Sequence, residues 1–342
     1  MGRVAMARSE AAAALPEVIP ASARDRPAGR RALVRTARFM RKRKLGAFGV
    51  VLVIVVLVAA ILSPLLQRYD DNRQFLARNP NYQAAPSGGG SVLAQLQAGK
   101  TANDVSEFVT ERFQSPNGTH WLGTDAFGRD IYARIIVGAR LAALIGIFAS
   151  LIAVTTGTVC GVVSGYFGGL IDLFFQRVVD GVQAFPALVL LLLIVQVFKT
   201  PPLWLTIAAL GFLGWATSVR VVRSAVLSIR QQPFIEAARS CGATDIRLML
   251  AHVLPNVVAV ILILFSIGIG AYILAEAALS FLGLGPQGVT TWGKMVEAGR
   301  NGLDLHPWES LFSGAAITVA VLGFNLAGDA LRDELDPRLR GR

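Results

Sequence analysis

Long apolar runs separated by short polar segments dominate the amino-acid sequence. A membrane-crossing helix needs about 20 apolar residues, because the hydrocarbon layer is about 30 Å thick and a helix rises about 1.5 Å per residue. Six runs approach or exceed this length, so the pattern predicts an all-α integral membrane protein with six transmembrane helices. The expected spans are roughly residues 45–66, 139–163, 182–198, 203–222, 255–282 and 311–330.

The third run is the shortest of the six, and we expect its helix to begin near Leu170, ahead of the run itself. Asp172, Gln176 and Asp180 are four residues apart, so on a helix they form one polar stripe, here placed at the membrane edge. Pro186 lies inside the run and predicts a kink.

Small residues recur every fourth position in the second run, which predicts a shallow groove along one face of the helix. Such a groove lets the backbone of a neighbouring helix approach closely. Packing is therefore favoured over the alternative, in which the stripe lines a pore. The residues concerned are Ala149, Ala153, Gly157, Gly161, Gly165 and Gly169.

Composition and charge agree with a membrane location. Of the 342 residues, 54% are hydrophobic and 16% are charged, and the mean hydropathy is +0.54, which excludes an ordinary soluble domain. The net charge of +11 arises largely from the first 44 positions and from short segments between the apolar runs. This distribution is a topology signal rather than the mark of a nucleic-acid-binding protein.

The distribution of Lys and Arg predicts the orientation in the membrane. Twelve of these residues precede the first run, so the positive-inside rule places the amino terminus in the cytosol as a polar tail rather than a cleavable signal peptide. Six crossings return the carboxyl terminus to the cytosol. Residues 223–254 and 332–342 carry four Arg each, as cytosolic segments should.

The polar segment between the fourth and fifth runs is the most informative part of the chain. Pro233 suits the first turn of a helix and Gly242 suits its end, so a helix of about two turns is expected. Thr244 is expected to cap a second helix that stops where Pro255 opens the fifth span. The result is a helical elbow in the cytosol. We expect the small residues Ala237 and Ala238 to give it a flat surface, and Glu236 to offer one charge to a partner.

The spacing within this elbow resembles a known signature. Glu236-Ala237-Ala238, three residues, Gly242, nine residues and then His252-Val253-Leu254-Pro255 is similar to the EAA motif of permease subunits in binding-protein-dependent ABC importers. In that family the elbow contains a coupling helix that sits in a cleft of the ATPase subunit. The resemblance implies an ATPase-coupling role for Phe234, Glu236, Ala237, Ala238, Gly242, Asp245 and Pro255.

Three further segments resemble the C-type permease subunit of dipeptide and oligopeptide importers. The first reads HWLGTDAFGRD at 120–130, followed by Gly138-Ala139-Arg140. The second reads EAALSFLGLG at 276–285, followed by Trp292-Gly293 and Gly299-Arg300. The third begins GDALRD at 328–333 and ends LDPRLR at 335–340. The resemblance extends over nearly everything from Phe39 onward.

The resemblance implies the type I ABC importer permease fold in a prokaryotic inner or plasma membrane. It divides the chain into a basic cytosolic tail (1–44), a first transmembrane helix (45–66), an extracytoplasmic segment (67–137), a permease transmembrane domain (138–332) with a cytosolic coupling loop (223–254), and a cytosolic tail (333–342). The implied partners are a second permease subunit, two ATPase domains or subunits and an extracytoplasmic substrate-binding protein. ATP and magnesium would bind the ATPase partners, and this chain would hold no cofactor or metal and catalyse no reaction.

Two groups of charged residues have open roles. Glu276 is the one acidic residue well inside an apolar run, and it either lines the translocation path or holds the outer gate through hydrogen bonds between helices. Asp125, Arg129 and Asp130 lie on the expected external side, where they either contact the binding protein or fix their own loop through an ion pair.

Other functions remain as alternatives. Related importers carry nickel complexes, glutathione or haem in place of peptides. A secondary transporter or channel driven by an ion gradient would usually need more than one buried ionisable residue, and Glu276 alone is a thin basis for it. A membrane enzyme would need clustered catalytic groups, whereas the three histidines are scattered along the chain.

Overall fold

The computed structural model describes residues 44–78, 108–198 and 201–335. The basic tail before residue 44, the part of the external segment at 79–107, the connector 199–200 and the ending 336–342 lie outside the described residues. Internal contacts divide the chain into two units, Met1–Ala47 and Phe48–Arg342. Of the first unit, only the opening residues of one helix are described, so the fold is that of the second unit.

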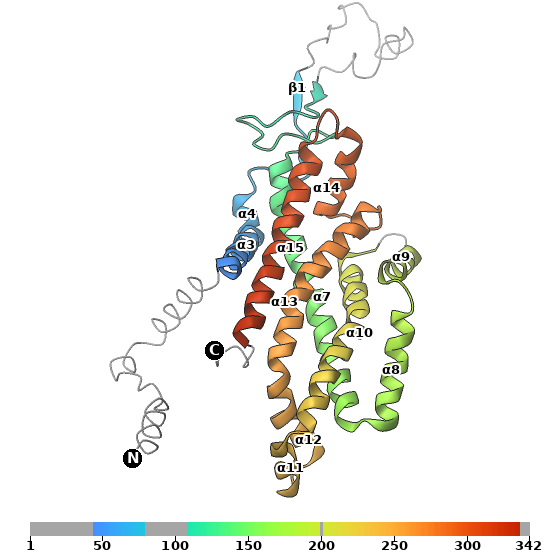
Figure 1. Ribbon diagram of the computed structural model, residues 1–342. Coiled ribbons are helices and arrows are strands. Elements are labelled where there is room, and N and C mark those ends of the chain that lie inside the picture. The colour runs from blue at the N-terminus through green and yellow to red at the C-terminus, as the bar shows by residue number, and fades with distance from the viewer. Residues whose placement is uncertain (1–43, 79–107, 199–200, 336–342) are drawn as a thin grey trace, which may run out of the picture. The chain divides into compact units, whose positions relative to one another are not determined.

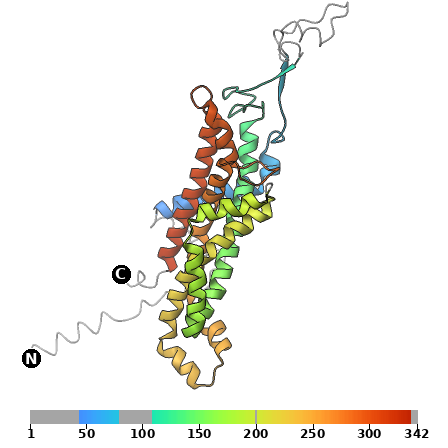
Figure 2. The same ribbon diagram turned by 90° about the vertical axis from the view of Figure 1, so that its right-hand side faces the viewer.

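Four long helices run side by side in the second unit (Figures 1 and 2). At one end they carry the short helices α11 and α12, called here the α11 end, and at the other end they carry α14, called the α14 end. The long helices are α7 (Ile131–Phe167), α10 (Leu203–Arg230), α13 (Leu254–Phe281) and α15 (Trp308–Leu335). The remaining helices are α3 (Lys44–Ile61), α4 (Ser63–Leu66), α8 (Gly169–Gln183), α9 (Ala187–Val197), α11 (Pro233–Ser240), α12 (Asp245–Arg247), the π-helix η3 (Leu248–Val253), α14 (Trp292–Gly299) and the 3₁₀ helix η4 (Arg300–Gly302).

Within the described residues, five helices are long and apolar enough to cross a membrane, or six if the bent pair α8 and α9 counts as one span. Each of the five overlaps a predicted span. The prediction of a helical membrane protein is therefore confirmed, while the count of six crossings stays a prediction.

The third predicted span is two helices rather than one kinked helix. The axes of α8 and α9 meet at 80°, and the break falls at Pro186. Proline has no amide hydrogen and disfavours the helical conformation of the residue before it, so a helix ends there. The 11 residues of α9 reach only about 17 Å, which is too short to cross the hydrocarbon layer alone.

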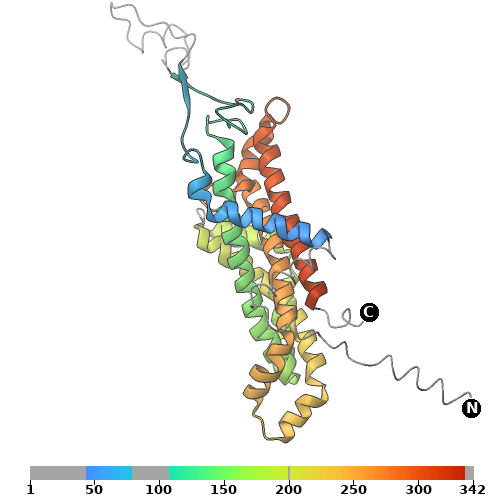
Figure 3. The same cartoon turned by 90° about the vertical axis from the view of Figure 1, so that its left-hand side faces the viewer.

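A proline also divides the first predicted span. Residues 45–66 form α3 and then the single turn α4, with Pro64 in the first turn of α4. Figure 3 shows α3 lying across the long helices rather than along them. Its Leu52 contacts α15 so closely that a Cβ added to Gly323 would lie 2.8 Å from the Leu52 Cβ.

The small-residue stripe of α7 packs against α10, as the packing interpretation predicted. A Cβ added to Gly161 would lie 2.9 Å from the carbonyl oxygen of Val219, and one added to Gly165 would lie 3.0 Å from that of Arg223. These backbones approach to a distance that only glycine permits. The expected member Gly169 does not belong to the stripe, because α7 ends at Phe167 and open space surrounds Gly169.

A short antiparallel sheet precedes α7, which the expectation of an all-α fold did not include. Its strands are β1 (Leu76–Arg78) and β2 (Phe108–Thr110), and Leu76 lies opposite Thr110.

An apolar core joins α7, α13, α14 and α15. Its buried members include Ile131, Ile273, Trp292, Met295, Ala320 and Phe324.

The contact between α7 and α10 can be tested by adding one methyl group. Gly161→Ala is expected to lower the stability of the detergent-solubilised protein by about 1–3 kcal/mol, because the new Cβ has no room against Val219. The measurement is thermal unfolding. Gly181→Ala, within α8 and facing open space, is the matched control and should be neutral or stabilising. Equal unfolding temperatures for the two variants would contradict the close packing.

Candidate functional site

The α11 elbow is built by local signals. Pro233 stands at the first helical position of α11, and its missing amide hydrogen leaves nothing unpaired there. At the other end Gly242 has a φ of +84°. The amide of Ala243 donates to the carbonyl of Ala238 at 3.2 Å, and the amide of Gly242 donates to that of Arg239 at 2.9 Å, which together form a Schellman motif. The two-turn helix predicted between Pro233 and Gly242 is confirmed.

One face of α11 is fastened to the helix bundle and the other faces outward. Ile235 is 2% exposed and packs in an apolar cluster with residues of α10, η3 and α13. Ala238 is partly buried and packs against the same cluster, whereas Ala237 is exposed, so the flat surface expected of the two alanines stays a prediction. Phe234 is 43% exposed, and Glu236 and Ala237 are also exposed, which leaves an apolar ring, a carboxylate and a methyl group on the outer face.

The second helix of the elbow begins as predicted but does not stop at Pro255. The Thr244 hydroxyl accepts a hydrogen bond from the amide of Arg247 at 3.4 Å and so caps α12. The chain then continues without a gap through η3 into α13. Pro255 has no amide hydrogen, and the wider π turns before it accommodate this loss. The Asn256 side chain donates to the His252 carbonyl at 2.6 Å.

Polar side chains attach the elbow to the end of α7. The Tyr166 hydroxyl donates to Asp245 Oδ1 at 2.6 Å and accepts from Arg239 Nη2 at 3.1 Å. Asp245, an expected coupling residue, is exposed yet engaged within the chain. The part played by Tyr166 and Arg239 was not predicted, since Tyr166 precedes Asp245 by 79 positions.

At the α14 end, Asp125 is the centre of a buried charge cluster. Its carboxylate accepts from Arg129 Nε at 2.7 Å and from Arg134 Nη1 at 2.5 Å. Arg134 also donates to Glu309 at 3.1 Å, so the cluster joins the loop before α7 to the start of α15. The amides of Phe127 and Arg129 donate to Asp125 Oδ1, both at 2.8 Å, which fixes the turn itself.

Asp130 caps α7 by accepting from the amide of Ala133 at 2.9 Å. Its second oxygen lies 2.8 Å from Nδ1 of the fully buried His120. The loop is therefore fixed by contacts of Asp125, Arg129 and Asp130 within the chain, which is the second of the two roles considered for these residues. Contact with a binding protein stays a prediction. Arg134 and Glu309, which complete the cluster, were not predicted.

Glu276 is 3% exposed and lies near the α14 end of α13. It accepts from the Ser280 hydroxyl at 2.5 Å, and Thr291 donates to Ser280 at 3.1 Å. Lys294 of α14 donates to the carbonyls of Pro286 and Val289. Burial lowers the pKa of Lys294, whereas the charge of Glu276 raises it. Glu276 thus lies within a hydrogen-bonded connection between α13 and α14; a role in the pathway or the gate stays a prediction.

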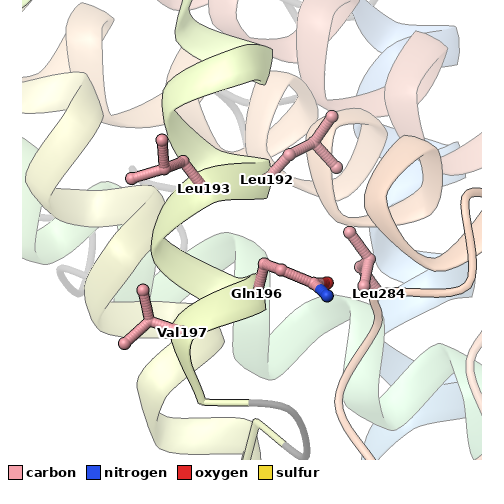
Figure 4. A pocket seen from close by; sticks show the side chains of 5 residues that line it. All are labelled: Leu192, Leu193, Gln196, Val197 and Leu284. Carbon is pink, nitrogen blue, oxygen red and sulfur yellow. The ribbon is translucent and has the colours of Figure 1, made fainter.

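An open groove of about 550 Å³ lies along α9 (Figure 4). Its lining is aliphatic except for the Gln196 amide, which points toward Leu284 across the groove. The lining has no charged group. Among the described residues, no set of three or more His, Cys, Asp or Glu side chains is placed to hold a metal ion.

These features define a helical membrane protein with an exposed helical elbow at one end, and comparisons with known proteins identify its family. The model of the binding-protein-dependent transport system inner membrane component matches residues 157–341, slightly more than half of the chain. A second model, the N-terminal TM domain of oligopeptide transport permease C, matches residues 33–86.

Curated relatives extend the match over most of the chain. The dipeptide transport system permease protein DppC of Alkalihalophilus pseudofirmus is 36% identical over 302 residues, 88% of each chain. The oligopeptide transport system permease protein OppC of Bacillus subtilis is 33% identical over 301 residues, again 88% of each. The glutathione transport system permease protein GsiD of Pectobacterium atrosepticum is 35% identical over 276 residues, 78% of this chain and 91% of that one.

The chain therefore belongs to the family of binding-protein-dependent transport system inner membrane components. It is a multi-pass protein of the bacterial inner membrane and a permease component of the ABC transporter class, whose permease subunits are non-catalytic.

The Asp125 cluster predicts a stability effect. Arg134→Gln is expected to destabilise the solubilised protein by about 3 kcal/mol, because it leaves the buried Glu309 carboxylate without a cation and the buried Asp125 carboxylate with Arg129 alone. Thermal unfolding measures the change. Arg300→Gln breaks an exposed pair with Glu297 at 3.9 Å and serves as the control, with an expected change within about 0.5 kcal/mol. If the two variants unfold at the same temperature, the cluster does not hold the α14 end together.

Proposed function

We propose that this chain is the C-type permease subunit of an ATP-driven importer of dipeptides or oligopeptides. The observation that carries the proposal is the α11 elbow. Its helix has a defined start and end, packs one face on the bundle, and leaves Phe234, Glu236 and Ala237 exposed. The names of the dipeptide and oligopeptide relatives support the substrate class. The chain would form half of the translocation pathway.

The proposed topology has six crossings, with both termini and α11 in the cytosol and the type I permease fold. The twelve Lys and Arg residues before the first span support the orientation. The partners are a second permease subunit, two ATPase domains or subunits at the α11 end, and an extracytoplasmic binding protein at the α14 end. ATP and magnesium bind the ATPases, and no cofactor binds this chain.

The proposed mechanism is a shift between two arrangements driven from outside the membrane. Closure of the ATPase pair on ATP moves α11, whose Ile235 is buried among the ends of α10 and α13. Because these helices are closely packed, displacement of α11 favours one helix arrangement over the other. The pathway then opens alternately to the two sides of the membrane.

The coupling role is tested in the complex reconstituted with its partners. Glu236→Gln and Gly242→Asp are each expected to leave the chain in the membrane. Substrate-stimulated ATP hydrolysis should fall roughly tenfold, since the first change loses a charged contact and the second strains a residue with positive φ.

Glu297→Gln, the same chemical change on α14, is the matched control and should retain stimulation. Full stimulation in both Glu236→Gln and Gly242→Asp would reject the coupling role. Transport by this polypeptide alone, driven by an ion gradient, would favour a secondary transporter instead.

Glutathione is a second candidate substrate, favoured by the GsiD relative. In vesicles with the complete complex, unlabelled dipeptides and oligopeptides are expected to compete with labelled peptide uptake, with little competition from glutathione. Saturable, ATP-dependent glutathione uptake without peptide competition would reassign the substrate while leaving the machinery unchanged.

A further inference from the structure

Tyr166 occupies an unusual place at the last turn of α7. Its residue is 2% exposed, and its ring packs in the apolar cluster that also holds Ile235 of α11, Val226 of α10 and Leu248 of η3. The phenol oxygen, by contrast, reaches polar partners at the rim of this cluster. Packing therefore holds the ring of Tyr166 in place, and the hydrogen bonds of its hydroxyl have a defined direction.

The hydroxyl joins the end of α7 to both helices of the elbow, which lie 73 and 79 positions further along the chain. It donates to Asp245 of α12 at 2.6 Å and accepts from Arg239 of α11 at 3.1 Å. Both partners are ionisable groups of the elbow, and hydrogen bonds to charged groups are stronger and more sharply oriented than neutral ones. One oxygen atom of α7 is thus hydrogen-bonded to both elbow helices, and a displacement of either helix changes the geometry of these bonds.

The same end of α7 is bound to α8 and α10. Ser164, two residues before Tyr166, donates to Asp172 of α8 at 2.5 Å. The Asp172 carboxylate in turn accepts hydrogen bonds from Nε and Nη2 of Arg223 on α10, each at 2.5 Å, which form a forked ion pair. Asp172, one member of the polar stripe predicted along α8, thus links α8 to both α7 and α10 at the α11 end.

We propose that Tyr166 is the positioning residue that passes displacement of α11 to the joined ends of α7 and α8. The apolar contact of Ile235 is non-directional, so it holds α11 near the bundle without fixing its register. The two hydrogen bonds of Tyr166 supply that register. This inference rests on the proposed function, because it assigns the residue through which the elbow acts.

The test uses Tyr166→Phe in the reconstituted complex, since this change removes the oxygen and retains the packed ring. Assembly with the partners is expected to match the unchanged protein. Substrate stimulation of ATP hydrolysis should fall by roughly tenfold or more, because the change removes both hydrogen bonds that the hydroxyl makes to charged groups. Tyr132→Phe, at the opposite end of α7, is the matched control and should retain stimulation.

Hydrogen exchange separates a positioning role from a merely structural one. In the unchanged complex, ATP binding is expected to alter amide exchange both in residues 233–247 and in residues 164–176. In Tyr166→Phe the change should persist in 233–247 and be lost in 164–176. Arg239→Gln combined with Tyr166→Phe should be no worse than the more impaired single variant, because both break the same connection.

Several results would overturn the proposal. Unaltered stimulation in Tyr166→Phe, an ATP-dependent exchange change that persists at 164–176, or failure of the variant to assemble would each do so, the last because it makes the hydroxyl a structural element. If the unchanged complex shows no stimulation, the proposed function itself fails. If it is coupled and Tyr166→Phe is equally coupled, only this inference fails.

Discussion

The close approach of α7 and α10 is the constraint on which the rest of the structure depends. Inside a bilayer, apolar side chains gain little from leaving lipid, so helices associate through tight van der Waals packing. The absence of side chains at Gly157, Gly161 and Gly165 lets the α10 backbone reach α7. This contact holds the last turns of α10 beside α7, and α11 follows directly after them. The elbow can act on the helices only because the end of α10, from which it extends, is held against α7.

Polar contacts then fasten the two ends of an otherwise apolar bundle. At the α14 end, Arg134 lies between Asp125 and Glu309 and ties the start of α7 to that of α15. At the α11 end, the forked pair of Asp172 with Arg223 ties α8 to α10. Charges placed near helix ends are paired and need not lie at the bilayer centre, where their desolvation is most expensive. Between the two ends, the long helices meet mainly through apolar packing, together with the hydrogen bond from the Ser150 hydroxyl of α7 to the Phe265 carbonyl of α13 at 2.8 Å.

Features encoded locally were predictable from the sequence. The ends of α11 follow from Pro233 and Gly242, and the packed stripe follows from glycines spaced by one helical turn. Pro186 marked the right position, but a proline specifies only that a helix is interrupted. The 80° angle between α8 and α9 depends on how each packs against its neighbours, which one sequence does not encode locally.

Features that depend on long-range pairing were not predictable. Arg134 and Glu309 lie 175 positions apart, and nothing near either residue indicates the other. The contact of Tyr166 with the elbow is of the same kind. The motif that identifies the elbow does not show which face of α11 is buried, so the packing of Ile235 on the bundle was not predicted either.

The central claim is that this bundle is driven through its elbow by partner ATPases. Native mass spectrometry of the complex purified from membranes through a tag on this chain, with all partner proteins coexpressed, tests it most directly. The account predicts an assembly with one copy of this chain, one second permease and two ATPase domains, and a variant with Glu236 and Phe234 both replaced should lose the ATPases while keeping the second permease. Recovery of this chain alone, or as an oligomer of itself without ATPases, would contradict the account.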